Sequence, residues 1–284
     1  MIEPFLRDSA LLADLARPDT EDDELAIWWL GQSGFLVRHG GSFLLLDPYL
    51  SDSLTRKYAA TDKPHVRMTE RVIAPEALRG INVVTSSHNH TDHLDAETLA
   101  PIFENNPSVQ FVIPEANRTF VAERLKCEEG WPIGVDDGAV LTVAGWTFTG
   151  IAAAHNEFQT DGAGRHHFLG YVIRRGPWCL YHSGDTLLYP GLADTLAEHA
   201  VDVAFVPING NRPERRVAGN LDGREAAQLA FDIGARVAIP HHFELFEFNT
   251  ADPRELFIPE CERLGQPYRV LRAGESFRLT PSTL

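Results

Sequence analysis

Short apolar runs separated by turn residues dominate the pattern of the chain. Runs at 25–30, 34–38 and 42–46 are divided by glycines at positions 31, 34, 40 and 41, which predicts three antiparallel strands joined by tight turns. Other runs rich in apolar and β-branched residues predict a hairpin over 139–154 and strands at 81–85, 109–113, 168–174, 178–182, 203–206, 236–240, 268–271 and 276–279.

The segments between these runs predict helices over 4–16, 96–103, 115–125, 190–199, 222–234 and 253–264. Asp95 stands where the N-cap of the second helix is expected, and Asp222 opens the fifth. Strands that alternate with helices, together with antiparallel pairs, predict an α/β (α+β) fold in which helices cover packed sheets.

No linker is visible after residue 24, so a single domain over 25–284 is predicted, preceded by an N-terminal helical arm over 1–24. We expect the arm to pack on its own domain, although it can also cover a site or mediate assembly into a homo-oligomer. The polar segment 51–70 has no clear periodicity and predicts a long loop, either a substrate-covering segment or a solvated surface loop.

Charge and cysteine content narrow the function classes. A formal net charge of −15 disfavours a nucleic-acid partner, because phosphates would be repelled. The three cysteines, at positions 127, 179 and 261, form no Cys-x-x-Cys pair and are typical of free thiols in a reducing compartment. An acidic N-terminus and the absence of a long apolar run argue against a signal peptide and a membrane partner, so we expect a cytoplasmic protein.

The segment 86–95 holds the densest group of chemically active residues: His88, His90, Asp92, His93 and Asp95. It follows a predicted strand and precedes a predicted helix. In an extended loop, residues two apart point the same way, so His88 and His90 can present two nitrogens to one cation. Imidazole and carboxylate groups suit zinc, manganese or iron, and the ligand types alone do not separate these metals. A polar loop whose histidines merely cap backbone groups is the disfavoured alternative.

The pattern His88-x-His90-x-Asp92-His93 resembles the signature of the metallo-β-lactamase-fold hydrolases. The chain is most similar to the branch that contains the ascorbate-6-phosphate lactonase, through segments 27–35, 46–51, 182–186, 207–210 and 240–243. The resemblance spans roughly residues 25–280. It implies a four-layer αβ/βα sandwich whose site lies at one edge of two packed sheets.

The resemblance also implies a ligand set for two divalent metal ions. One ion is expected on His88, His90 and His155, the other on Asp92, His93 and His242, with Asp185 bridging them. Asp47 and His241 are expected beside these ligands, where Asp47 orients a metal-bound histidine.

The expected reaction is hydrolysis by a hydroxide that bridges two metal ions, with Asp92 and Asp185 as the catalytic carboxylates. The resemblance favours a lactonase or ester hydrolase acting on a small polar or phosphorylated molecule. A phosphodiesterase is the main alternative, and a non-catalytic metal-binding protein is the alternative from another class. Asn209 and Arg212, in the loop after the strand at 203–206, are the expected substrate contacts, although this chain has Asn211 where the branch is expected to carry arginine.

Overall fold

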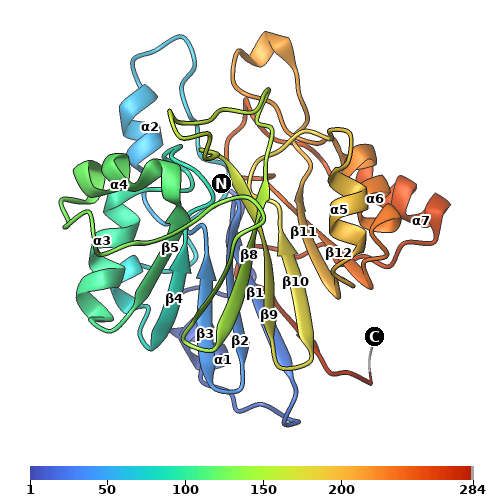
Figure 1. The fold of residues 1–284 in the computed structure, drawn as a ribbon, viewed down its shortest axis with the longest axis horizontal. Helices are drawn as coiled ribbons and strands as arrows, with labels where there is room; N and C mark the ends of the chain where they lie inside the picture. The colour runs from blue at the N-terminus through green and yellow to red at the C-terminus, as the bar shows by residue number, and fades with distance from the viewer. Residues whose placement is uncertain (283–284) are drawn as a thin grey trace.

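Two β-sheets lie face to face at the centre of the computed structural model, which describes residues 1–282 (Figure 1). The first sheet has the strand order β13-β1-β2-β3-β4-β5-β6, with β1 Leu25–Gly31, β2 Gly34–His39, β3 Ser42–Leu46, β4 Ile81–Thr85, β5 Gln110–Pro114, β6 Ile133–Val135 and β13 Ser276–Leu279. The second has the order β12-β11-β10-β9-β8-β7, with β7 Val140–Val143, β8 Trp146–Ala152, β9 Leu169–Arg175, β10 Trp178–His182, β11 Val203–Pro207 and β12 Val237–His241.

Helices lie on the outer sides of the two sheets (Figure 1). The helices are α1 Asp8–Leu15, α2 Ser53–Tyr58, α3 Ala96–Asn105, α4 Arg118–Leu125, α5 Leu192–Ala197, α6 Gly223–Asp232 and α7 Phe257–Leu264. Helices α3 and α4 flank the first sheet, and α5, α6 and α7 flank the second, so the predicted α/β sandwich of four layers is confirmed. Within the described residues, no helix has the length and apolar content needed to span a membrane.

One predicted strand is absent from the structure, and one observed strand was not predicted. Residues 268–271 form no strand, and only Tyr268 makes an isolated bridge, to Ala238. Conversely, β6 contains glycine in a run of three residues, which is too short and too weak in side-chain pattern to detect. The segment 51–70 contains the short helix α2 in addition to loop.

Strand direction brings the polar loops to one edge of the molecule. In the first sheet, β3 and β4 run parallel, and β1 runs with them because β2 is antiparallel to both neighbours. In the second sheet, β10, β11 and β12 are parallel, and β8 shares their direction because it pairs antiparallel with β9. The C-terminal ends of β1, β3, β4, β8, β10 and β12 therefore meet at the same rim.

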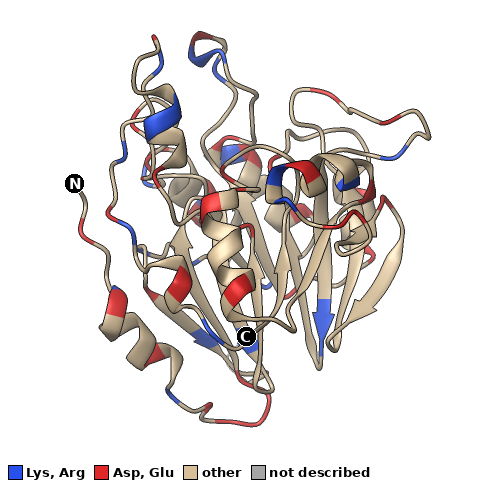
Figure 2. Cartoon of the chain, turned by 90° about the vertical axis from the view of Figure 1, so that its left-hand side faces the viewer, with Lys and Arg blue, Asp and Glu red and all other residues tan. Residues whose placement is uncertain are grey.

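The inner faces of the sheets bury large side chains, among them Phe35, Trp146 and Phe205, which are all fully buried. The Trp146 indole nitrogen donates to Ser42 Oγ at 3.0 Å, which joins the two sheets by a polar contact inside the core. Charged residues lie mainly on helices and loops, while most of the strand surface is uncharged (Figure 2). The polar loops of the rim therefore extend from strands that pack in an apolar core.

Helix α1 packs at the end of the sheets opposite the rim. Leu11 is fully buried, and Asp14 Oδ2 accepts a hydrogen bond from the Trp28 indole at 2.7 Å. Helix α1 therefore contacts its own sheet, whereas the first residues of the arm pair with the segment 51–70 through a bridge between Ile2 and Thr69. The predicted domain end at residue 284 lies outside the described residues.

Replacing Leu11 with alanine is expected to lower the free energy of unfolding by about 2–5 kcal/mol, because it leaves a cavity under α1. Chemical denaturation followed by circular dichroism measures this change. Leu12→Ala on the same helix is the control, since Leu12 is 38% exposed and its loss is expected to cost under about 0.5 kcal/mol. Equal effects of the two substitutions would contradict the packing of the arm.

Candidate metal centre

The rim collects three histidines that can hold one metal ion. Ligand atoms of His88, His90 and His155 all lie within 4.8 Å of one another. His88 and His90 follow β4, whereas His155 comes from the end of β8 in the other sheet. His88 and His155 are buried, and His90 is exposed. The two sheets therefore contribute to one group, which opens outward at His90.

A second group of three residues, Asp92, His93 and His242, meets the same distance criterion. His242 Nε2 lies 3.5 Å from Asp92 Oδ2, and His93 Nε2 lies 3.8 Å from the same oxygen. His93 is fully buried, while the Asp92 side chain keeps 17% of its surface exposed. This group lies next to the first, because His88 also shares a cluster with His93.

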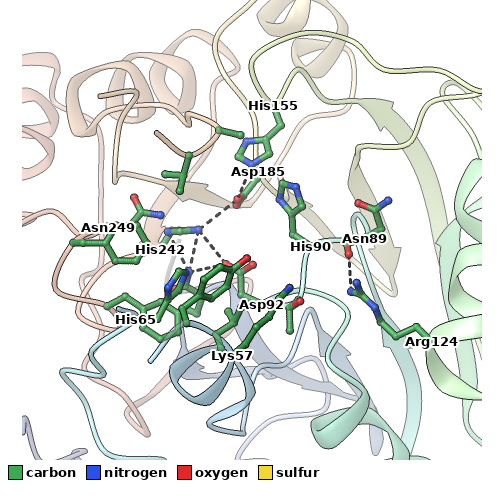
Figure 3. A pocket seen from close by; sticks show the side chains of 18 of the residues that line it. Lys57, His65, Asn89, His90, Asp92, Arg124, His155, Asp185, His242 and Asn249 are labelled. Atoms are coloured by element: carbon green, nitrogen blue, oxygen red, sulfur yellow. Dashed lines mark hydrogen bonds and ion pairs between the residues drawn. The ribbon is translucent and has the colours of Figure 1, made fainter. Parts of the chain in front are cut away.

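Asp185 lies between the two groups (Figure 3). Its Oδ2 is 3.6 Å from His155 Nε2 and 3.4 Å from His242 Nε2, and its Oδ1 is 3.3 Å from His93 Nε2. Gly184 permits this placement: it has φ +57°, and a Cβ there would lie 2.7 Å from Ser87 Oγ. The structure thus brings all seven residues named as ligands from the sequence into one cluster.

Several polar atoms in the cluster are buried without a hydrogen-bond partner: His88 Nε2, His93 Nε2 and Asp185 Oδ1. Such atoms are rare in folded proteins because each carries a desolvation cost of about 1–3 kcal/mol. All three are good metal ligands, and they belong to one cluster of ligand atoms within 4.8 Å of one another. A cation at this point would satisfy them together, so the residues present fit a metal centre.

The opposite ring nitrogens of these histidines are fixed by the protein. Asp47 Oδ2 lies 2.7 Å from His93 Nδ1, and Gly219 O lies 2.8 Å from His155 Nδ1. Ser87 Oγ lies 3.0 Å from His88 Nδ1 and also donates to Asp47. Carboxylate and carbonyl partners of this kind fix the tautomer and the orientation of a metal-binding imidazole. Asp47 therefore occupies the supporting position expected from the sequence.

The pKa values of the histidines in the cluster differ from those of free side chains. Burial lowers the pKa of His88 well below its usual value. Although His90 keeps part of its surface accessible, desolvation by the surrounding protein and the neighbouring His155 lower its pKa to about 4. Burial also opposes protonation of His93 and His242, but Asp185 and Asp92 outweigh it and raise the pKa of His242 to about 9. Cation binding to such a cluster displaces protons from the imidazoles.

His241 is the last residue of β12 and points away from the cluster of ligands. Its ring stacks on His182 with centroids 5.2 Å apart and an interplanar angle of 5°. His241 Nε2 lies 3.4 Å from Ser183 Oγ, and the residue is fully buried. His242, the next residue, has φ +62° and turns its ring into the cluster. The histidine pair is thus divided between the core and the site.

The structure does not bring Asn209 and Arg212 into the site. Asn209 is 2% exposed, and its amide groups bond to Asn249 at 3.0 Å and to Asn220 at 3.0 Å. Arg212 lines a separate small cavity between the loop after β11 and the segment before α7. Asn249, which is hydrogen-bonded to Asn209, lines the space above the histidine and aspartate cluster, whereas Asn209 and Arg212 do not.

A cavity of about 440 Å³ opens directly above the cluster. His90, Asp92, His155, Asp185 and His242 form its floor, and the walls come from α2, α4 and the segments near 65, 217 and 248. Several of the lining residues were not singled out from the sequence: Gln32, Lys57, His65, Arg124 and Asn249. Gln32 is the one with a local signal, because it stands in the Gly-Gln-Ser-Gly turn after β1; its Nε2 donates to Asp92 Oδ2 at 2.9 Å.

Comparison of the sequence with known proteins gives a family match and two similar relatives. The family model described as "Beta-lactamase superfamily domain" matches residues 43–243. A UPF0173 metal-dependent hydrolase of Opitutus terrae is 28% identical over 90% of this chain and 100% of its own length. The probable L-ascorbate-6-phosphate lactonase UlaG of Escherichia coli is 24% identical over 82% of this chain and 73% of its own length.

Among solved structures, a metallo hydrolase from the archaeon Ignicoccus hospitalis matches with a TM-score of 0.65 at 23% identity, over 90% of this chain and 99% of that one. This likeness shows the fold, and the family match covers most of the chain together with the metal-binding loop. The chain therefore belongs to the family described as "Beta-lactamase superfamily domain". It is a metal-dependent hydrolase of the metallo-β-lactamase fold and is similar to the UlaG branch.

Proposed function

We propose that the protein is a dinuclear metal-dependent hydrolase that opens a lactone or ester bond in a small molecule. The observation that carries this proposal is the convergence of unpartnered ligand atoms from His88, His93 and Asp185 at the base of an open cavity. A single ion leaves part of this set unused, because two separate triads lie on either side of Asp185. Zinc, manganese and iron all suit these imidazole and carboxylate ligands.

In this proposal, His88, His90 and His155 hold one ion, and Asp92, His93 and His242 hold the other. Asp185 is the shared ligand, supported by the distances of 3.6 and 3.4 Å from its Oδ2 to the two flanking histidines. If bound there, two such ions would supply a hydroxide nucleophile at neutral pH and would polarise the oxygen under attack. The residues of the chain hold the ions in place, and the surrounding cavity positions the scissile bond above them.

The open floor of the cavity favours catalysis over a structural metal site. Structural zinc sites are closed by four protein ligands, whereas catalytic sites keep a position open. Here His90 is exposed, and the cavity reaches both triads. The name of the E. coli relative supports a lactone as the substrate. The charge of −15 supports a small-molecule substrate in preference to a nucleic acid.

The proposal as a whole is tested by metal analysis of protein purified without added metal, coupled to assays on a panel of lactones, esters and phosphodiesters. We expect two ions per chain and turnover of lactones or esters. Turnover of phosphodiesters alone would replace the lactonase assignment. A protein that binds metal and hydrolyses none of the panel would support a non-catalytic role.

Replacing Asp185 with alanine is expected to abolish hydrolysis and to reduce bound metal. The loss in metal affinity should exceed the roughly 10–100-fold cost of removing an outer partner of a ligand. Metal content and rate are measured on the same sample. A fully active variant that retains two ions would contradict the shared position of Asp185.

The adjacent histidines are expected to differ sharply. His242→Ala should lose metal, because its ring faces Asp92 and Asp185. His241→Ala should lower stability through the lost stacking on His182 while keeping the metal content per folded molecule. Metal analysis alongside circular dichroism separates the two effects. Loss of metal from the His241 variant alone would show that the neighbours have been assigned in reverse.

Asp47→Asn is expected to weaken metal binding by roughly 10–100-fold, since it weakens the partner that orients His93. Competition with a chelator of known affinity measures the change. Asp14→Asn is the control, because Asp14 is also a buried carboxylate but lies on α1, at the far end of the sheets. Equal metal affinities of the Asp47 variant and the unmodified protein would contradict the supporting role of Asp47.

A further inference from the structure

The cavity wall that faces the histidines carries two cationic side chains, Lys57 from α2 and Arg124 from α4 (Figure 3). The other charged residues of the lining, apart from histidines, are Asp92 and Asp185, which belong to the metal cluster. No carboxylate within the described part of the chain forms an ion pair with Lys57 or Arg124. Two unpaired cations at one cavity stand out in a chain whose net charge is −15.

Lys57 differs from the other basic residues of its segment. Arg56 pairs with Glu97, Arg67 pairs with Asp52 at 2.7 Å, and Lys63 donates to the carbonyl of Arg216 at 2.6 Å. Among the described residues, the ammonium of Lys57 has no carboxylate in an ion pair, and it lies over the ring of Tyr58, at 5.1 Å. The basic residue of segment 51–70 that lines the cavity is therefore the one left without a partner.

Arg124 has part of its guanidinium available. Its Nη1 donates to the carbonyls of Asn89 at 2.7 Å and Leu94 at 3.1 Å, both in the metal-binding loop. The group also lies over the Phe120 ring at 4.4 Å. These contacts hold the guanidinium in place without neutralising its charge. A fixed guanidinium with free donors suits a carboxylate or a phosphate.

The adjoining wall is apolar and aromatic. Buried Tyr49, Leu54, Leu245 and Phe246 form a small cluster apart from the main core, with Tyr58 and Phe248 packed against it. His65 stacks on Tyr58 at 4.2 Å and meets Phe248 edge-on at 4.5 Å. Burial lowers the pKa of His65, so this wall is uncharged at neutral pH. A flat apolar group fits against such a surface.

We propose that the substrate is an amphiphilic anion: a lactone or ester whose carboxylate or phosphate contacts Lys57 and Arg124, and whose flat apolar part lies against Tyr58, His65 and Phe248. The inference deepens the proposed function and rests on it only for the position of the scissile bond, above the metal cluster. Recognition of the anion and of the ring depends on the cavity walls alone. The segment 51–70 thereby becomes a specificity element.

Binding of small probes to the metal-loaded protein tests this recognition without turnover. Titration calorimetry compares benzoate and phenyl phosphate, which carry both a ring and an anion, with acetate, inorganic phosphate and benzyl alcohol. Acetate and phosphate control for direct binding of an anion to the metal ions. We expect both ring-bearing anions to bind more tightly than any of the other three probes, and the tighter of the two identifies the anion as carboxylate or phosphate.

Lys57→Gln is expected to weaken the ring-bearing anions by roughly three- to thirtyfold, the effect of one charge-assisted contact at an exposed position, and to leave benzyl alcohol unchanged. Lys126→Gln is the matched control, because it removes the same charge from an exposed lysine outside the cavity. Phe248→Ala should weaken benzoate but not acetate. Arg124→Gln should weaken the same anions as Lys57→Gln, measured per metal-loaded molecule.

Unchanged affinity of both ring-bearing anions in the Lys57 variant would overturn the inference. The outcome is separable from that of the proposed reaction. If benzoate binding depends on Lys57 while no lactone or ester is hydrolysed, recognition stands and the reaction fails. If esters are hydrolysed with the same KM for charged and neutral analogues in both the unmodified protein and Lys57→Gln, the reaction stands and the recognition fails.

Discussion

The structure depends on one constraint at the rim: carboxylates and imidazoles are buried together, and some of their polar atoms have no hydrogen-bond partner. Asp185 has an unpartnered oxygen at 3% exposure, and His88 and His93 each have an unpartnered nitrogen. Burying such atoms is unfavourable unless a cation satisfies them together. The parallel strand ends of two sheets bring these atoms to one point, so the fold creates an electrostatic requirement that a bound metal ion would meet.

Backbone conformation shows how firmly the fold holds this point. Gln32, Asp47 and His242 all have left-handed φ values, of +51°, +39° and +62°. Each such residue costs of the order of 1–3 kcal/mol and persists only where the surroundings determine it. All three follow directly after strands of the two sheets, so the packed core supplies the rigidity that keeps their side chains aimed at the cluster. Metal ligands can therefore be preorganised on loops.

The sequence predicted the parts of the site that are local in the chain. His88, His90, Asp92 and His93 lie within six residues, and their spacing alone indicates metal chemistry. His155, Asp185 and His242 are isolated along the chain, so they were identified only through the family resemblance. The strands were predictable where apolar runs are long, whereas the three-residue β6 and the bridge at Tyr268 depend on tertiary contacts.

The cavity walls were not predictable for the same physical reason. Lys57, Arg124 and Phe248 meet at the cavity from segments far apart in the chain, and none of them has a distinctive neighbour. Asn209 is a polar loop residue of the kind that contacts substrates, but its side-chain amide is hydrogen-bonded to Asn249 and Asn220. Whether a polar loop residue faces a ligand or another loop depends on how the loops pack. That packing involves residues far apart in the chain, so the local sequence does not reveal it.

The pairing of β13 with β1 has a consequence for biosynthesis. Residues 276–279 form the edge of the sheet beside β1, which begins at residue 25, so that edge is completed by a segment synthesised long after β1. Until then β1 presents unpaired backbone groups at an open edge, which invites pairing with another chain. Joining two strands so far apart in the chain is a long-range step that slows folding. Loss of residues 276–279 by truncation or proteolysis would leave β1 as the exposed, aggregation-prone strand.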